Sequence, residues 1–137
     1  MKKYNLEQLT ENQVLDFLSS KPISRVQIAK FCAATNDFNP LFLDHHFANE
    51  AGFGGNLVPG NFILALCEDY LHHILHIESI TELSVTFEKL VWPGEEIQCQ
   101  AQVITIDKKA KRLELHIKAQ NHSKEIILQG TAICVLE

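Results

Sequence analysis

The stretch NFILALCEDYLHHILH, residues 61–76, decides the fold. Its apolar side chains recur at helical spacing and predict the longest helix of the chain, about 16 residues. The N-terminal part of this segment is apolar on all sides. A helix of that kind is typical of a protein core, where it is usually wrapped by a sheet.

Four segments follow the helix and predict strands, and the first three of them have apolar residues at alternate positions. They are ITELSVTFEKLVW (80–92), IQCQAQVITID (97–107), LELHIKAQN (113–121) and IILQGTAICVLE (126–137). The turn-forming segments PGEE, KKAKR and HSKE separate them. Turns between long strands predict an antiparallel meander, and the helix that precedes it predicts an α+β fold in which the sheet wraps a central helix.

Two helix starts are expected before the central helix. Ser24 is a good N-cap for the amphipathic segment that follows it, and Asp44 is a good N-cap for a short helix in HHFANEA. Residues 7–18 are expected to form a short helix or an irregular lead-in. Because no repeat, low-complexity tract or linker divides the chain, residues 1–137 are expected to form one domain.

Composition argues against several classes of partner. The net charge of −5 argues against nucleic-acid binding and against an anionic membrane surface, and the basic run at 108–112 is interpreted as a solvated turn. No apolar run is long enough to cross a membrane, and no apolar segment follows the N-terminal lysines as in a signal peptide. The four cysteines form no C-x-x-C pair, so we expect buried thiols, no metal and a cytoplasmic location.

A second stretch, TNDFNPLFLDHHFANEAGFGGNLVPGNF at residues 35–62, mixes residue types that neither a plain helix nor a plain strand would carry. Its key run is Thr35-Asn36-Asp37-Phe38-Asn39-Pro40-Leu41-Phe42-Leu43-Asp44, followed by Phe47-Ala48, Gly54-Gly55 and Gly60. With the helix-then-sheet layout, this run resembles the MaoC-like branch of the hot-dog fold. That family comprises (R)-specific enoyl-CoA hydratases and 3-hydroxyacyl-thioester dehydratases. Its signature reads Ser/Thr-Gly-Asp-x-Asn-Pro-Ile/Leu-His-x-Asp, then Phe-Ala, Gly-Gly and a Gly that opens the central helix.

The resemblance implies chemistry on an acyl thioester of coenzyme A or of acyl carrier protein. Adding water across the C2–C3 double bond needs a base for water, an acid for C2 and donors for the charge that develops on the thioester oxygen. By residue-to-residue matching, Asp37 takes the acid–base role. The backbone N–H of Gly60 takes the oxyanion-donor role, at a helix end where N–H groups are unpaired. The resemblance implies no cofactor.

Further site residues are expected around these two. The substrate-binding candidates are Asn39, Phe42, Asn61 and Phe62. Asn39 and Pro40 are expected to supply a rigid turn that aims the following side chains into the site. Asp44 also matches a signature position, but its expected role is to cap the short helix.

The chain departs from the family signature at Phe42, which stands where the family has His. Asn36 also replaces the usual Gly, and Asn61 stands where an apolar residue is common. Since an acid–base group contributes roughly 10²–10⁴ in rate, the loss of the His predicts an impaired enzyme. His45 and His46 are the nearest imidazoles and are expected to face solvent.

Three hypotheses for function remain open. The first is a hydratase/dehydratase that uses Asp37, and the second is a non-catalytic subunit in which Phe42 only lines an acyl tunnel. The third is a hot-dog thioesterase. A single hot-dog sheet leaves an unpaired edge and an open tunnel, so the resemblance implies a homodimer, or a heterodimer with a related chain that has the His.

Overall fold

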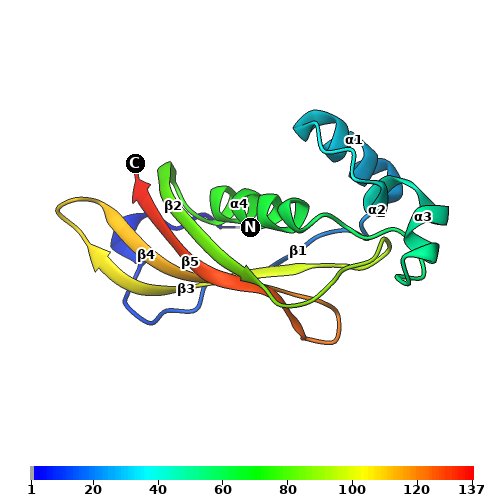
Figure 1. Ribbon diagram of the computed structural model, residues 1–137. Coiled ribbons are helices and arrows are strands. Elements are labelled where there is room, and N and C mark those ends of the chain that lie inside the picture. The colour runs from blue at the N-terminus through cyan, green and yellow to red at the C-terminus, as the bar shows by residue number, and fades with distance from the viewer. Residues whose placement is uncertain (1) are drawn as a thin grey trace.

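The computed structural model describes residues 2–137 and shows an antiparallel sheet curled along one side of a long helix (Figure 1). The helices are a 3-10 helix η1 (Leu6–Gln8), α1 (Arg25–Thr35), α2 (Pro40–Leu43), α3 (His45–Glu50) and α4 (Gly60–Ile74). The strands are β1 (Leu18–Ser19), β2 (Ile77–Phe87), β3 (Gln98–Asp107), β4 (Arg112–Gln120) and β5 (Ile126–Leu136). Their order in the sheet is β1-β3-β4-β5-β2. The α+β prediction is therefore confirmed.

The core lies between α4 and the concave face of the sheet. The buried residues of α4 recur on one side of the helix, and the strands of the sheet meet them with every second residue. From α4 these are Ile63, Cys67, Tyr70, Leu71 and Ile74, and from the middle strands Cys99, Ala101, Val103, Leu113, Leu115, Ile117 and Ala119. The sheet covers only one side of α4: although the N-terminal part of the helix is apolar on all sides, Ala65 is exposed and Leu64 and Leu66 are half-buried.

The predicted meander is correct for β3, β4 and β5, which pair consecutively. The expected hairpin across PGEE is wrong, because β2 ends at Phe87 and pairs with β5 on the far side of the sheet. The connection over residues 88–97 crosses to the opposite edge instead. Long-range backbone hydrogen bonds hold it there: Val58 N–H donates to Val91 O at 2.8 Å, and Ile23 N–H donates to Glu95 O at 3.1 Å.

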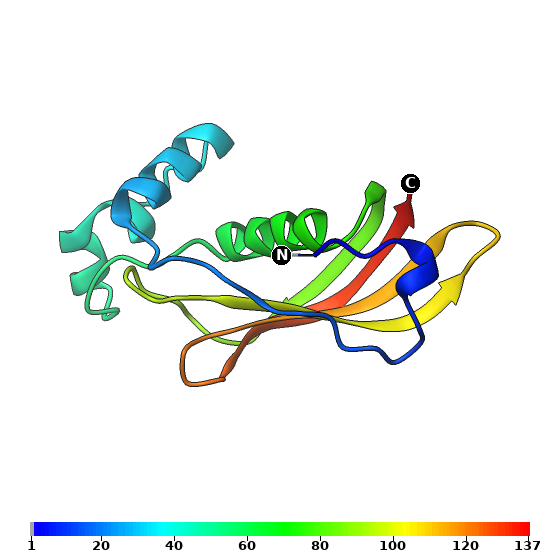
Figure 2. The same ribbon diagram turned by 180° about the vertical axis from the view of Figure 1, so that it is seen from behind.

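Helices α1, α2 and α3 form a lobe that stands off the sheet, beside the N-terminal end of α4 (Figures 1 and 2). Both predicted caps are confirmed. Ser24 Oγ accepts from Gln27 N at 3.1 Å while Gln27 Oε1 accepts from Ser24 N at 2.9 Å, and Asp44 Oδ1 accepts from Phe47 N at 3.1 Å. The sequence therefore fixes locally where α1 and α3 begin.

Candidate active site

The Asp37 turn begins where α1 ends. Asn36 adopts the left-handed conformation (φ 54°, ψ 36°), which explains why Asn stands where the signature has Gly, since Asn is among the few residues that tolerate it. Asp37 N–H then donates to Cys32 O at 2.9 Å. Burial, and after it the charge of Asp37, raise the pKa of the Cys32 thiol. The carboxylate of Asp37 thus lies half-buried beside the last turns of α1.

Asn39 shapes the next part of the turn. Its backbone N–H donates to Asp37 Oδ1 at 3.3 Å, and its side-chain Oδ1 accepts from Leu41 N at 3.0 Å, which caps α2. Pro40 occupies the first turn of α2, where its missing N–H costs nothing. The expected rigid turn is therefore present, and the side-chain oxygen of Asn39 is engaged in building it.

The turn lies next to an apolar wall. Phe42 is half-buried and packs against the main core. The rings of Phe31 in α1 and Phe62 in α4 meet edge-to-face, with centroids 5.3 Å apart and planes at 79°. Phe31 comes six residues before Asp37 and Phe62 two after Gly60, so this contact joins the helix that leads into the Asp37 turn to the first turn of α4. Asn61, in contrast, is exposed.

The start of α4 offers backbone donors. Its N-cap is Pro59, and no side chain caps this end. Phe62 N–H donates to Pro59 O at 3.0 Å, so the N–H groups of Gly60 and Asn61 are the ones suited to a negatively charged oxygen. A Cβ added to Gly60 would lie 2.9 Å from Cε1 of Phe87, so glycine is what lets this aromatic ring of β2 close over the helix end.

Sequence reasoning missed a polar network that ties α2 to the segment entering α4. Asn56 is 3% exposed; its Nδ2 donates to Leu41 O at 3.2 Å and its Oδ1 accepts from Arg25 Nη2 at 3.0 Å. Leu57 N–H also donates to Leu41 O, at 3.1 Å. The available signal was a single amide residue between Gly55 and the apolar Leu57-Val58. A buried amide of this kind must find partners, and here the partners are Arg25 of α1 and Leu41 of α2.

The two adjacent imidazoles, of His45 and His46, contact groups other than Asp37. His46 Nε2 lies 3.3 Å from Glu50 Oε1, one helical turn on, and both side chains are well exposed. His45 lies against Gly55 and lines a cavity of about 180 Å³ with Arg25, Asn56 and Trp92. Across the described residues 2–137, we find no hydrogen bond from either imidazole to Asp37. The carboxylate of Asp37 therefore has no imidazole partner among the described residues.

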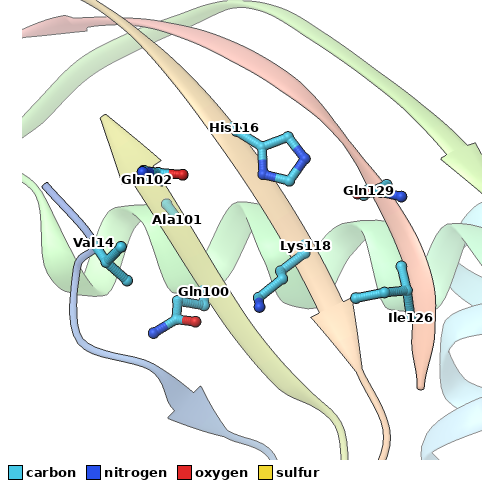
Figure 3. Close-up of a pocket in the computed structure, with 8 residues that line it drawn as sticks. All are labelled: Val14, Gln100, Ala101, Gln102, His116, Lys118, Ile126 and Gln129. Carbon is cyan, nitrogen blue, oxygen red and sulfur yellow. The ribbon is translucent and has the colours of Figure 1, made fainter. Parts of the chain in front are cut away.

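The cavities near the lobe and on the outer sheet face do not enclose Asp37 or Gly60. The outer one, about 280 Å³, lies on the side of the sheet away from α4 and is lined by polar side chains such as Gln100, His116 and Lys118 (Figure 3). Near the candidate site, several apolar side chains other than the half-buried Phe31, Phe42 and Phe62 are exposed. They include Phe38 (61%), Phe47 (45%), Phe87 (48%) and Leu90 (49%).

The described part of the chain has neither a metal-binding cluster nor a membrane-spanning helix. Over residues 2–137, no three His, Cys, Asp or Glu side chains gather in a way that could hold a metal ion. None of the helices there is both long and apolar enough to span a membrane.

Comparison with solved structures identifies the fold class. The (R)-hydratase from Aeromonas caviae involved in PHA biosynthesis superposes with a TM-score of 0.84 at 23% identity, covering 96% of this chain and 99% of that one. The C-terminally truncated HadBC (3R-hydroxyacyl-ACP dehydratase) complex from Mycobacterium tuberculosis gives 0.72 at 17% identity, covering 90% and 95%. The protein thus has the hot-dog fold.

Sequence comparison gives the family. The family described as "MaoC like domain" matches residues 7–125, and the chain belongs to it. It is 30% identical to the (R)-specific enoyl-CoA hydratase of Aeromonas caviae over 121 residues, which cover 85% of this chain and 89% of that protein. It is 26% identical to fatty acid synthase 2 of Mycosarcoma maydis over 93% of this chain, but spans only 3% of that protein's length.

Proposed function

We propose that the protein is an acyl-thioester hydratase/dehydratase that interconverts 2-enoyl and (3R)-hydroxyacyl thioesters of coenzyme A or acyl carrier protein. The observation that supports this proposal is the Phe31–Phe62 contact, because it joins α1, the helix that leads into the Asp37 turn, to the first turn of α4, whose start has no side-chain cap. A carboxylate beside free backbone donors is what addition of water to a conjugated thioester requires. The family membership supports the same reaction.

In this proposal the thioester oxygen binds the N–H of Gly60. Asp37 takes a proton from a water molecule as the water oxygen adds to C3, and negative charge moves to the thioester oxygen. The protonated Asp37 then delivers that proton to C2, so one carboxylate serves as base and then as acid. Phe42 and Phe62 contribute apolar surface for the acyl chain. Without a second acid–base group, the rate should be roughly 10²–10⁴ below that of a site with an Asp–His pair.

Phe42 favours a second candidate function, a non-catalytic subunit that holds the acyl thioester. Phenylalanine has no proton to exchange, and at this position it packs on the core as an acyl-tunnel residue would. In this alternative a related chain with the family His supplies the catalysis. The HadBC dehydratase, solved as a complex, is a structural relative in which two chains are associated.

For either function we propose a dimer in the cytoplasm, with residues 1–137 acting as one domain. The edge strand β2 is 11 residues long and has β5 as its neighbour in the sheet. A long edge of this kind is suited to pair with the same edge of a second copy. The exposed Phe87 at the end of β2 would then be covered by the partner.

Hydration of crotonyl-CoA tests the enzyme proposal directly. It is followed as the loss of the absorbance of the conjugated thioester, with wild-type protein, Asp37→Asn, and Glu68→Gln as a control that removes an exposed carboxylate on α4. We expect slow hydration by wild type and by the control, and a loss of roughly 10²–10⁴ for Asp37→Asn. Full activity of Asp37→Asn would refute the assignment of Asp37. An inactive wild type that Phe42→His makes active would instead establish the binding subunit.

A further inference from the structure

Two cysteines far apart in sequence meet inside the protein. Cys67 on α4 and Cys99 on β3 are 1% and 4% exposed, and their Sγ atoms are 3.7 Å apart. Both are free thiols. A disulfide has an S–S length of about 2.05 Å, so the sulfurs would have to come closer by about 1.7 Å. Rotation of the two side chains about their Cα–Cβ bonds can supply a movement of this size.

A cavity gives access to one of the two thiols. It has a volume of about 230 Å³, lies between α4, β1 and β3, and is lined by Cys99 but not by Cys67. Since a water molecule occupies about 30 Å³ of liquid, the cavity admits a molecule as small as hydrogen peroxide. A small oxidant can therefore reach Cys99 from the side of β1 while Cys67 stays behind it in the core.

We propose that Cys67 and Cys99 form a dithiol site for a peroxide-class oxidant, and that its oxidation to a disulfide fastens α4 to β3. The thiolate of Cys99 attacks the O–O bond, which gives a sulfenic acid and hydroxide. The sulfur of Cys67 then displaces the sulfenic oxygen, which leaves as water, and the S–S bond forms. In total, two thiols and one hydrogen peroxide give one disulfide and two water molecules, with the sulfurs oxidised by two electrons and the peroxide reduced by two.

The surroundings set the speed of this reaction. The contact with Cys67, and next its burial, hold the pKa of Cys99 well above its usual range, so the reactive thiolate is scarce at neutral pH. The other titratable groups at the cavity are Asp69, Tyr70 and His73, all on α4, while β1 contributes the hydroxyl of Ser19. Oxidation should therefore be slow at pH 7 and faster at pH 9.

The site differs from the other buried cysteines. Burial raises the pKa of Cys134 to about 12. Among residues 2–137, the one sulfur–sulfur contact is that between Cys67 and Cys99, so Cys134 has no thiol partner there. A variant that replaces Cys134 thus removes one buried thiol without touching the pair, which makes it the matched control for a variant at Cys67.

The test is oxidation of the folded wild-type protein with hydrogen peroxide, followed by unfolding and alkylation with iodoacetamide. We expect four alkylated cysteines before oxidation, two after it, and four again after reduction. Trypsin combined with a glutamate-specific protease cuts after Glu50 and so separates Cys32 from Cys67. The cross-linked peptides should then join Cys67 to Cys99. Four alkylated cysteines after oxidation, or a cross-link between other cysteines or other chains, would refute the site.

The variants and the thermal midpoint complete the test. After oxidation, Cys134→Ser should keep one alkylated cysteine out of its three, whereas Cys67→Ser should show no disulfide. Because the new bond closes the loop from residue 67 to residue 99, the Tm of oxidised wild type should rise by about 5–10 °C. An unchanged or lower Tm would contradict the stabilising link between α4 and β3. If the variant at Cys67 does not fold, the peptide map of oxidised wild type still shows whether Cys67 and Cys99 are joined.

Discussion

The lobe of α1, α2 and α3 and the body of α4 with its sheet are held together in different ways. In the helices of the lobe only Ile28, Cys32 and Ala48 are buried, and Phe38 and Phe47 are exposed. In the body, by contrast, every second residue of β3 and β4 faces the core over most of their length. The free energy of folding should therefore come mainly from the body. The lobe contains the candidate catalytic residue Asp37 and is held in place mainly by a few hydrogen bonds.

This contrast predicts how variants in the two parts should differ in activity and in stability. Changes at the site in the lobe should alter the reaction rate and leave stability nearly unchanged, whereas changes in the body should do the reverse. Residues that join the two parts should affect both properties. The four predictions below test this division, from the largest expected effect to the smallest.

The largest effect is expected for Phe42→His in the lobe. An imidazole at this position would give Asp37 the partner that the family signature provides, so kcat for crotonyl-CoA should rise by roughly 10²–10⁴. Phe42 is only half-buried, so the Tm should fall by no more than a few degrees. A matched Phe42→Leu variant controls for the loss of the ring and should show no gain. No gain in kcat for the His variant would place the missing acid–base group elsewhere.

The body should respond in the opposite way. Leu71 on α4 is fully buried, and its replacement by Ala should lower the free energy of unfolding by about 2–5 kcal/mol. Urea denaturation measures this loss. At a temperature where the variant is still folded, its kcat/KM should stay close to the wild-type value. A large drop in kcat/KM of the folded variant would show that the body and the site are coupled.

The sequence could predict the lobe more completely than the body. Helix starts depend on neighbouring residues, so the caps by Ser24 and Asp44 were readable, and so was the turn at Asn39-Pro40. The path of residues 88–97 depends on partners far away in the chain, such as Val58 for Val91, so the PGEE segment was mistaken for a hairpin. Local turn signals state that a chain turns, but not which strand it joins afterwards.

The same limit applied to the site. The sequence predicts Asp37 and Gly60 as site residues because they stand in a contiguous motif, whereas the hydrogen bonds of Asn56 involve Arg25, which lies 31 residues away. Nothing in the local sequence shows that these two side chains meet. The burial of the Asn56 amide also depends on the loop that folds over it. Positioning residues of this kind become visible only in three dimensions.

Asn56→Ala should affect both properties, because Asn56 joins the lobe to the segment entering α4. The change leaves Leu41 O without one of its two donors and frees the guanidinium of Arg25. We expect a loss of about 1–3 kcal/mol in the free energy of unfolding, and a lower kcat/KM because the Asp37 turn is less well fixed. Asn49→Ala, at an exposed asparagine within helix α3, is the control. An unchanged kcat/KM in the folded Asn56→Ala variant would show that the network is purely structural.

The smallest effect is expected for Ser24→Ala at the start of α1. The change removes the acceptor for Gln27 N and breaks the reciprocal cap, at a cost of about 0.5–2 kcal/mol in helix stability. Because α1 stands off the sheet, much of this cost should appear as local fraying of its first turn, not as a lower global Tm (Figure 1). Amide hydrogen exchange resolves the two outcomes. Faster exchange confined to the first turn of α1 would support an independently held lobe, whereas a matching fall in protection across β3 and β4 would show that lobe and body unfold as one unit.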